Sequence, residues 1–353
     1  MTTYNDFLII GCGRMARGIA AGLRKLGVLR VRVWDRDVEA MTNLERDAQQ
    51  SPLIYAACDA QASPKLHRGT TVFSTLGPAD NIGWMETAIE AHSHWVDLNA
   101  DSSQWEQNGK AQQHGSICLP DCGLAPGMSQ VLARMLFGSF AKPRAIGISC
   151  GGLPQTPSPP WMYECTWNVE GLVAEYSGTA EARFGNEVIN VPALSDIADF
   201  HGVIRNETWH VTGLERATTR GGLSTLVHRL PVPILSYGTL RYRGHFHLMK
   251  AVLDAGLLES EPARQRFISS LPVTGRDIVV LAGCCVDENA CTLHVVCIIP
   301  PADGLTAMQR ATGFAAALAW KHGVLLGNQC GVLPIDEAVD CGDVFNEWKQ
   351  MTR

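Results

Sequence analysis

The chain has 353 residues, of which 46% are hydrophobic and 18% charged, so it is long enough for two hydrophobic cores and too apolar for a disordered chain. Its formal net charge is −6 and no segment is strongly basic, which argues against a nucleic-acid partner. No apolar run reaches the roughly 20 residues that a membrane span needs, which argues against a membrane protein.

The N-terminal residues and the cysteines lead us to expect a cytoplasmic protein. Residues 1–6 lack the basic start of a signal peptide. The 12 cysteines are scattered, many of them within apolar runs, where a thiol acts as a small buried side chain and not as half of a disulfide. Because no CxxC pair occurs, we expect no metal site.

Buried strands and amphipathic helices alternate along the first 120 residues. We expect strands at 7–10, 31–35, 70–76, 94–99 and 116–120, and helices at about 14–26, 37–50, 81–92 and 102–114. This alternation is typical of a doubly wound parallel sheet. The sequence therefore predicts an α/β protein whose residues 1–125 form a Rossmann dinucleotide-binding domain.

The pattern changes after Pro126. A helix at 127–138 and a strand at 145–152 precede a Pro-rich loop at 153–160, and strands then dominate to about residue 300. The expected strand segments are EARFGNEVINVP, ETWHVTG, LSTLVHRL, GTLRYRGH, DIVVLAGCCV and ACTLHVVCII, with a hairpin turn at NACT. We predict a second α+β domain with a largely antiparallel sheet over 126–304, for substrate binding and dimerisation. The apolar helix at 305–324 is expected to return residues 305–353 to the first domain.

A GxGxxA motif follows the first strand and opens the first helix. Gly11 permits a tight turn, Gly13 lets the backbone approach a pyrophosphate, and Ala16 keeps the helix close to the sheet. Asp35 ends the second strand, where a carboxylate binds ribose hydroxyls and repels a 2′-phosphate, so NAD is expected. Arg36 leaves NADP possible, because an arginine there also binds a 2′-phosphate.

Further cofactor contacts are expected from the backbone on either side of this motif. Arg14 and Met15 open the helix whose N–H groups face the phosphates. Thr75, Leu76 and Gly77 follow another Rossmann strand, at the same edge of the sheet. FAD is the weaker alternative, because the chain has no second nucleotide motif.

The segment PDCGLAPGM at 120–128 is similar to the PxCGxAPGxS/N element of the saccharopine dehydrogenase-like family. Other segments agree in the same order along nearly the whole chain, namely VFSTLGPADN, HWVDLN, GGLPQTPSPPWMYECTWNVEGLVAEY, INVPALSD, GTLRYRGH and TAMQRATGFAAALA. The resemblance implies an N-terminal Rossmann domain and a second α/β domain with substrate and dimer contacts. A homodimer or larger homo-oligomer is therefore expected.

The resemblance also implies hydride exchange at a carbon that bears an amine. The segments are most similar to those of L-lysine 6-dehydrogenases, which implies oxidation of lysine C6 to an imine, followed by hydrolysis to the 6-semialdehyde and ammonia. A saccharopine- or carboxynorspermidine-type enzyme is the alternative in the same class. It needs a second anion-binding arginine, for which the chain offers Arg205, Arg216, Arg220 and Arg229. A catalytically silent NAD-binding regulatory protein is the alternative from another class.

Hydride leaves only a carbon whose amine is neutral, so a general base is needed. Asp121 follows a Rossmann strand and is the first candidate for the base or for an electrostatic anchor, with helix capping as its alternative role. Cys122 and Asn99 are candidate substrate contacts near the same edge, against packing and loop stabilisation.

The second domain offers groups for the substrate's charged ends. Arg241 is the candidate carboxylate clamp, with Arg243 as its alternate on the same face of the strand, and His245 is a candidate proton shuttle. Trp167 is expected to wall the pocket or to pack in the core. Weaker candidates are Glu170 and Glu175 for the amino end, and Thr312 and Gly313 for the cofactor.

Overall fold

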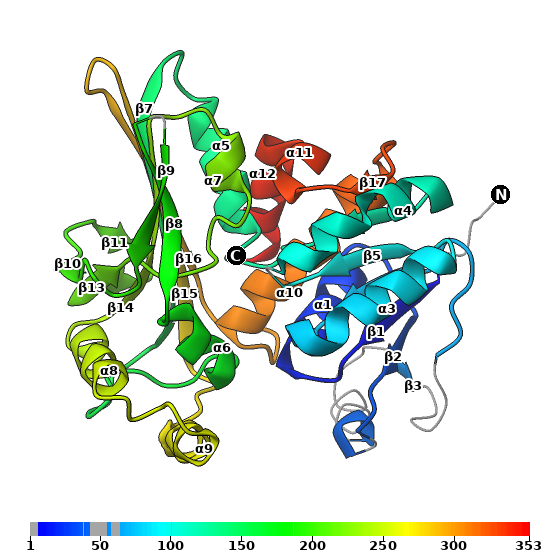
Figure 1. Cartoon of the computed structure of the whole chain (residues 1–353), viewed down its shortest axis with the longest axis horizontal. Coiled ribbons are helices and arrows are strands. Elements are labelled where there is room, and N and C mark those ends of the chain that lie inside the picture. Colours follow the sequence, from blue (N-terminus) through cyan, green and yellow to red (C-terminus); the bar gives the residue numbers. More distant parts are fainter. Residues whose placement is uncertain (1–5, 38, 43–54, 58–63, 100, 186) are drawn as a thin grey trace. The chain divides into compact units, whose positions relative to one another are not determined.

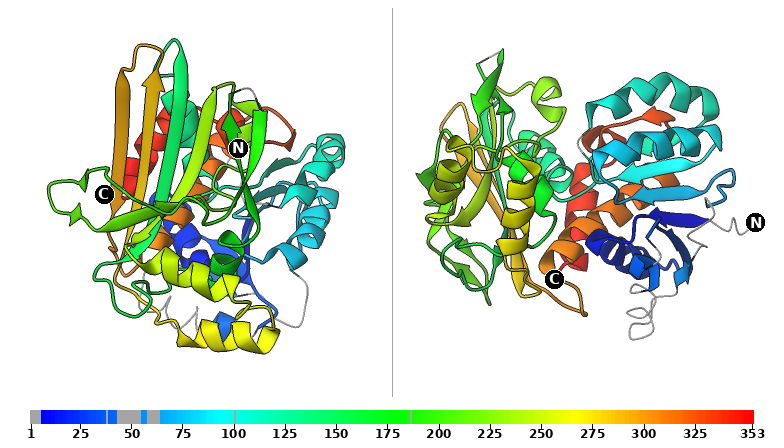
Figure 2. Two further views of the ribbon diagram at one scale, coloured as in Figure 1. Left: turned by 60° about the vertical axis from the view of Figure 1, so that its left-hand side comes forward. Right: turned by 60° about the horizontal axis from the view of Figure 1, so that its bottom comes forward.

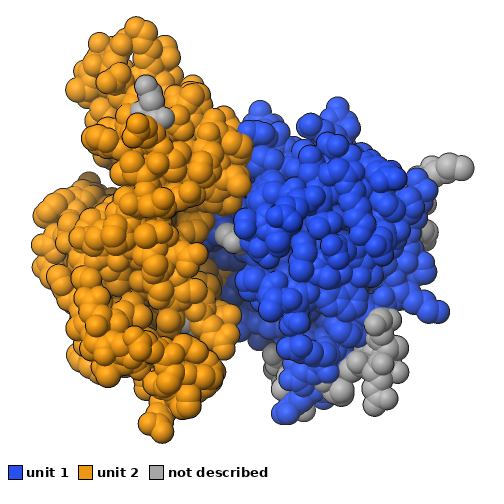
Figure 3. Space-filling view, in the orientation of Figure 1, with its two compact units in different colours: residues 1–131, 309–353 blue, residues 132–308 orange. Residues whose placement is uncertain are grey.

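The computed structural model of the chain describes residues 6–37, 39–42, 55–57, 64–99, 101–185 and 187–353. The chain divides into two compact units, one of residues 1–131 with 309–353 and the other of residues 132–308 (Figure 3). Most of the helix expected at 37–50 lies outside the described residues. Within that range, residues 39–42 are helical. No helix in the described ranges is long and apolar enough to cross a membrane.

In its described part, the first unit contains a sheet of seven strands in the order β17-β6-β5-β4-β1-β2-β3 (Figure 1). Every neighbouring pair is parallel. The strands are β1 (Phe7–Ile10), β2 (Val31–Trp34), β3 (Tyr55–Ala57), β4 (Thr71–Ser74), β5 (His94–Asp97), β6 (Ile117–Leu119) and β17 (Gly331–Val332). The order of β1 to β6 is that of the Rossmann fold, so the predicted α/β class is confirmed.

Helices of the first unit connect these strands or follow them. They are α1 (Arg14–Lys25), α3 (Pro78–Glu90), η1 (Ser102–Gln107), α4 (Asn108–His114), α10 (Ala307–Ala319), η2 (Trp320–Leu325), α11 (Ile335–Ala338) and α12 (Cys341–Met351). All four residues of β1 are buried, as expected for a strand between two parallel neighbours. Helix α1 ends beside Gly27, whose φ of +88° is the left-handed conformation that glycine adopts easily.

Among its described residues, the second unit contains an eight-stranded sheet whose main path runs β10-β13-β14-β7-β15-β16; β8 pairs with β14, and β9 pairs with β8. Its pairs are antiparallel except β7 with β14, so the predicted second α+β domain is confirmed. The strands are β7 (Pro143–Pro154), β8 (Thr179–Phe184), β9 (Glu187–Pro192), β10 (Ala198–Asp199), β13 (Leu214–Ala217), β14 (Ile234–Tyr242), β15 (Asp277–Asp287) and β16 (Thr292–Ile299). Figure 2 shows the long strands β14, β7, β15 and β16 side by side.

Two helices of the second unit replace structure that the sequence analysis assigned to strands. The segment LSTLVHRL contains α7 (Leu226–Arg229), and β14 ends at Tyr242 instead of continuing through His245. Gly244, with φ +97°, turns the chain, and His245 opens α8 (His245–Asp254). The other described helices are α6 (Val169–Glu175) and α9 (Glu261–Ser270), and α5 (Met128–Phe137) begins in the first unit and ends in the second.

The sheet of the second unit packs on both faces. Because strand residues alternate, Arg241 and Tyr242 of β14 point to opposite sides. Beside Arg241 lies a hydrophobic cluster that includes Tyr176 and Phe246, and Tyr242 belongs to a cluster with Ile278. A small hairpin of β11 (Ile204–Arg205) and β12 (His210–Val211) supplies two residues to the Tyr242 cluster.

Candidate active site

The turn between β1 and α1 has the geometry that a dinucleotide requires. Gly11 has φ +95°, and a Cβ there would lie 2.4 Å from the Thr75 hydroxyl oxygen. A Cβ on Gly13 would meet nothing within 4 Å, so the backbone at the start of α1 faces open space. The first turn of α1 contains no acidic residue. The turn therefore fits a pyrophosphate held by N–H groups at a helix N-terminus.

Asp35 lies directly after β2 and binds this turn. Its Oδ2 accepts the backbone N–H of Cys12 at 2.7 Å, and its Oδ1 accepts that of Asp37 at 2.9 Å. The half-exposed carboxylate keeps further lone pairs for ribose hydroxyls. The Arg36 side chain is 80% exposed and lies 3.4 Å from the Asp80 carboxylate. The structure thus keeps both the group that favours NAD and the cation that leaves NADP possible.

The other predicted cofactor residues lie around the same turn. Arg14 is exposed and Met15 half-buried in the first turn of α1. The Thr75 hydroxyl donates to the Gly11 carbonyl at 3.2 Å, and Gly77 immediately precedes α3. Leu76 is half-buried and packs against the hydrophobic cluster of the sheet.

Gly313 and Thr312 of α10 pack within the first unit. A Cβ on Gly313 would lie 2.1 Å from the backbone of Gly18, and the Thr312 methyl would lie 3.4 Å from a Cβ on Gly123. Gly18 of α1 and Gly313 of α10 therefore face each other where the two helices pack too closely for a side chain. It favours the packing role over the cofactor contact for these residues of α10.

A buried polar network joins the carboxyl ends of β4 and β5. The Asp97 Oδ2 accepts the Trp95 indole N–H at 2.7 Å and the Asn81 amide at 2.9 Å, and its Oδ1 accepts the Asn99 backbone N–H at 2.8 Å. The Ser74 hydroxyl donates to the Asn81 carbonyl oxygen at 2.6 Å. Burial raises the pKa of Asp97 to about 6, although these donors and the Asp121 backbone act in the opposite direction.

This network fixes the position of Asn99. The Asn99 side-chain amide donates to the Leu76 carbonyl at 2.8 Å, which links the loops that follow β4 and β5. The geometry therefore favours loop stabilisation for Asn99, and its role as a substrate contact stays a prediction.

Asp121 and Cys122 lie on the loop after β6. Asp121 is 1% exposed and has φ +62°, a conformation uncommon for a residue with a side chain. The Cys122 backbone N–H donates to the Asp97 carbonyl at 2.7 Å, and its thiol donates to the Leu119 carbonyl at 3.3 Å. Burial raises the pKa of Cys122 well above its ordinary value, so the thiol stays protonated. The loop therefore holds Asp121 against the Asp97 network.

Arg241 is the centre of a second buried network, in the other unit. It is 3% exposed, and its Nε donates to the Tyr176 hydroxyl at 2.8 Å. Its Nη2 lies 3.6 Å from Glu175, and its guanidinium stacks 5.0 Å from the centre of the Tyr163 ring. Burial alone would lower the pKa of Arg241, but Tyr176, Glu175 and Tyr163 raise it, so Arg241 is a permanent cation.

His245 completes this network in its neutral form. Its Nδ1 lies 2.8 Å from the Trp161 carbonyl, which only accepts, so Nδ1 carries the proton. Its Nε2 then accepts the hydroxyl of Tyr176 at 3.1 Å. Burial, and secondly the charge of Arg241, lowers the pKa of His245 to about 3. The proton-shuttle role required a pKa near neutrality, so the structure favours positioning of Tyr176 instead.

Arg243 does not share a face with Arg241, and that prediction is wrong. Strand β14 ends at Tyr242, and beyond it Arg243 is exposed, with its Nε 2.7 Å from Asp199. Trp167 is half-buried over Gly171, where a Cβ would lie 2.5 Å from the indole ring. Glu170 is exposed beside it, whereas Glu175 lies within the Arg241 network.

Sequence reasoning missed Asp97 and Tyr176 as organising residues. Asp97 carried one signal, since it ends a buried strand at the edge where Rossmann proteins bind ligands. Tyr176 carried none, because its partners lie 65 and 69 residues further along the chain. The described residues contain no cluster of metal-binding side chains.

The parallel sheet and its glycine turn define a dinucleotide-binding protein with a second α+β unit. Residues 7–119 match the family model described as saccharopine dehydrogenase NADP binding domain, and residues 123–351 match the model of the saccharopine dehydrogenase C-terminal domain. The chain therefore belongs to the saccharopine dehydrogenase family, as the sequence resemblance indicated. Its first unit carries the family's nicotinamide dinucleotide-binding domain.

Two relatives are similar over most of the chain. A saccharopine dehydrogenase [NADP(+), L-glutamate-forming] of Pyricularia oryzae is 24% identical over 298 residues, which are 77% of this chain and 65% of that protein. This chain thus spans less than two thirds of that relative. The apo structure of saccharopine dehydrogenase (L-Glu forming) from Saccharomyces cerevisiae has 17% identity and a TM-score of 0.72, covering 98% of this chain and 97% of the other. The second similarity shows a shared fold.

Proposed function

We propose that this protein is a nicotinamide-dependent dehydrogenase that oxidises the ε-amino carbon of L-lysine to the 6-semialdehyde and releases ammonia. The observation that carries this proposal is the Arg241–Glu175 pair, in which the cation lies against the rings of Tyr163 and Tyr176 and faces one carboxylate. An amino acid presents the complementary pair, a carboxylate and an ammonium group. The family membership supplies the dinucleotide domain that such an oxidation needs.

The first unit is assigned to the cofactor. Gly11, Gly13 and the N–H groups that open α1 would hold the pyrophosphate, and Asp35 would hold the adenosine ribose. When bound, the nicotinamide ring supplies the acceptor for the hydride. Asp35 supports NAD as the preferred cofactor, with NADP as the alternative that the exposed Arg36 favours.

The second unit is assigned to the substrate's α-carbon end. Arg241 would bind the carboxylate because it is a permanent cation, and Glu175 would accept the α-ammonium. Glu175 is oriented by the hydroxyls of Thr219, at 3.2 Å, and Thr239. Trp167 would line the methylene chain. This substrate exchanges the 3.6 Å contact of Arg241 with Glu175 for two shorter ones.

The chemistry at the other end of lysine needs a proton acceptor and a water. The ε-ammonium must lose a proton before its carbon releases a hydride, and we assign this proton to Asp121. The position of Asp121 supports the assignment, because it follows β6 at the carboxyl edge of the sheet, where Rossmann domains bind their ligands. Hydrolysis of the resulting imine gives the aldehyde and ammonia. Asn99 and Cys122 are further candidates for substrate contact near this loop.

A saccharopine-type dehydrogenase is the second candidate, supported by the curated relative in Pyricularia oryzae. Saccharopine carries additional carboxylates and needs a further cation. Arg216 is half-buried on the opposite side of the sheet, because it pairs with Leu240 in register. The Arg220 side chain is exposed, and its backbone N–H donates to the backbone carbonyl of Glu175 at 3.0 Å. It is therefore the candidate second clamp.

The proposal is tested by absorbance at 340 nm with NAD and NADP against lysine, ornithine, saccharopine and diamines. Lysine turnover with stoichiometric ammonia release is the expected result. Turnover of saccharopine without ammonia release, lost in Arg220→Gln, would establish the second candidate. A protein that binds the dinucleotide by calorimetry but oxidises none of these amines contradicts both. The cytoplasmic location and a homodimeric or larger assembly remain part of the proposal, and sedimentation velocity tests the assembly.

A further inference from the structure

The second unit contains a cavity of about 530 Å³ on the side of its sheet away from Arg241. Tyr242 lines this cavity, whereas its neighbour Arg241 belongs to the network on the other face. A volume of this order is typical of a pocket for a small molecule. The cavity is therefore separate from the groups assigned to lysine.

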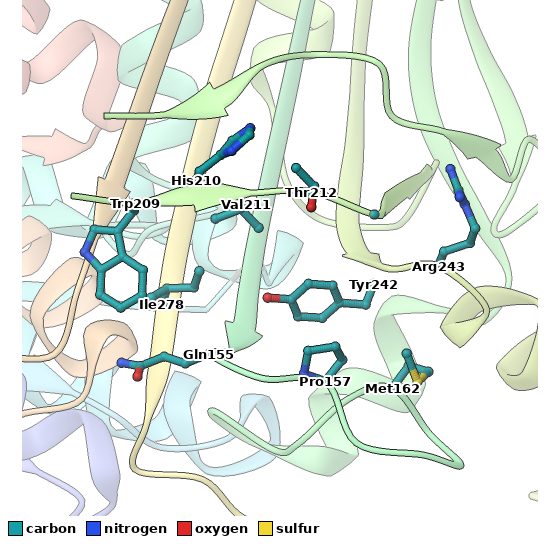
Figure 4. Close-up of a pocket in the computed structure, with 11 residues that line it drawn as sticks. Gln155, Pro157, Met162, Trp209, His210, Val211, Thr212, Tyr242, Arg243 and Ile278 are labelled. Atoms are coloured by element: carbon teal, nitrogen blue, oxygen red, sulfur yellow. The ribbon is translucent and has the colours of Figure 1, made fainter. Parts of the chain in front are cut away.

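The hairpin of β11 and β12 forms one wall of the cavity and is held in place by defined contacts. The Asn206 side chain accepts the N–H groups of Thr208 at 2.9 Å and Trp209 at 2.7 Å, which fixes the turn between β11 and β12. Val211 of this hairpin is buried, in a hydrophobic cluster that also contains Ile204 of the same hairpin. The hairpin thereby anchors the Trp209 indole at the cavity wall (Figure 4).

The walls of the cavity are mainly apolar and aromatic. Figure 4 shows the Tyr242 ring between the hairpin and the Pro-rich loop, which contributes Pro157, with Ile278 between Tyr242 and Trp209. The Met162 side chain closes the side next to Pro157. Flat apolar surfaces of this kind favour a planar ligand, because an aromatic ring buries a large area at little entropic cost.

The polar groups that line the cavity include the Tyr242 hydroxyl, together with Gln155, His210 and Thr212. Tyr242 is 8% exposed, and its hydroxyl is directed toward the middle of the cavity (Figure 4). Among the described residues the hydroxyl has no hydrogen-bond partner. The hydroxyl faces the open space of the cavity, where a phenol can donate one hydrogen bond to a bound molecule. The cavity thus presents a hydrogen-bond donor to a ligand that carries an acceptor.

The charge of the lining identifies the kind of acceptor. Within the described part of the chain, Arg243 is the only permanently charged residue that lines the cavity, and no acidic residue lines it. Asp199 occupies the Nε of Arg243 and leaves its two Nη groups for another anion. We propose that this cavity is a second ligand site, for a small aromatic carboxylate whose ring lies against Trp209 and whose carboxylate accepts the Tyr242 hydroxyl.

Isothermal titration calorimetry of the full chain with 2-naphthoate, and with neutral 2-naphthamide as a matched compound, tests the proposal. We expect the carboxylate to bind at least tenfold more tightly than the amide. Tyr242→Phe keeps the ring and removes one hydrogen bond, so it should weaken binding about tenfold. Trp209→Ala should remove detectable binding. Phe184→Ala, at a residue 65% exposed outside the cavity, is the control that leaves binding unchanged.

Two variants of the ion pair separate charge from packing. Arg243→Gln should weaken binding of 2-naphthoate, whereas Asp199→Asn, which breaks the same pair but keeps the cation, should not. The proposal is overturned if 2-naphthoate gives no heat at millimolar concentrations or if the amide binds equally well. Unchanged affinity in Tyr242→Phe and Trp209→Ala would likewise overturn it. Because Tyr242→Phe preserves packing, its affinity for 2-naphthoate tests the proposal even if Trp209→Ala does not fold.

Discussion

Each unit buries a polar network around one ionisable side chain, and the two networks differ in the partners that surround this side chain. Asp97 is surrounded by neutral donors, namely the Trp95 indole, the Asn81 amide and backbone N–H groups. Arg241 instead faces the carboxylate of Glu175. The carboxyl without a cation has its pKa raised to about 6, whereas the paired arginine stays charged.

This difference predicts where the protein responds to pH. A buried acid with neutral partners changes its charge close to neutrality, because hydrogen bonds offset only part of the desolvation cost. In the Arg241 network, His245 has a pKa of about 3 and Tyr176 a pKa well above its ordinary value, so neither titrates near neutral pH. We therefore expect pH sensitivity to arise in the Asp97 network and not in the Arg241 network.

The largest effect is expected from Arg241→Met. The variant leaves Glu175 buried without its cation, which typically costs about 3–5 kcal/mol. Urea unfolding measures the loss. Arg243→Met is the matched control, because its pair with Asp199 is 62% and 45% exposed and contributes less than about 1 kcal/mol. Equal losses in the two variants would show that the Arg241 network is no more than a surface pair.

The second prediction concerns the stability of Asp97→Asn at different pH values. The folded-state pKa of about 6 lies above the ordinary value of 3.8, so the protonated carboxyl favours folding. Its contribution is fully present below pH 3.8 and is lost as pH rises through 6, by about 3 kcal/mol in total. The substituted amide does not titrate, so the stability of the variant relative to the native chain should increase between about pH 4 and pH 7.5.

Urea unfolding across that pH range provides the measurement. Asp35→Asn is a control that removes a carboxylate of the same unit outside the Asp97 network. A difference between Asp97→Asn and the native chain that stays constant with pH would contradict the raised pKa. The comparison of the two networks would then lose its physical basis.

Tyr176→Phe tests the other network by removing a single hydroxyl. The hydroxyl accepts from Arg241 and donates to His245, so its loss leaves two buried groups without this partner. We expect a loss of about 1–3 kcal/mol, independent of pH between about 6 and 8. Thermal unfolding at several pH values measures it, with Tyr242→Phe as the control. A loss that grows toward low pH in this range would mean that His245 titrates near neutrality.

The sequence predicted the first unit better than the second, for a physical reason. A buried parallel strand such as FLII is a continuous apolar run, and the glycine turn after it is recognisable alone. In the second unit, β14 passes into α8 within three residues, and only Gly244 marks the change. The helix α7 has four residues, too few for a helical period to appear.

The same limit applies to the candidate site. Arg241 was predicted from its charge, but its partners were not, because Tyr176 lies 65 residues away on the C-terminal side of α6. The Asp97 network joins Ser74, Asn81 and Trp95, which come from β4, α3 and β5. Their contact follows from the strand order of the sheet, which no local pattern in the sequence contains.

A carboxylate at the surface of the first unit gives the smallest expected effect. Asp35 accepts N–H groups from Cys12 and Asp37 and, unlike Asp97, lies half-exposed beside the glycine turn, where we propose that it binds the ribose. Asp35→Asn removes the carboxylate charge and keeps one acceptor. We expect NADP affinity to rise by about tenfold relative to NAD, equivalent to about 1.4 kcal/mol, because repulsion of the 2′-phosphate disappears.

Calorimetric titration with NAD and NADP measures this ratio. Asp37→Asn removes the same charge two residues further along the chain, where the carboxylate accepts the N–H groups of Glu39 at 2.9 Å and Ala40 at 3.2 Å. If position matters, only Asp35→Asn changes the ratio, and the exposed Arg36 then binds the added phosphate. If both variants change it equally, the preference reflects the general negative field of the surface. Asp35 would then serve only to hold the glycine turn through Cys12.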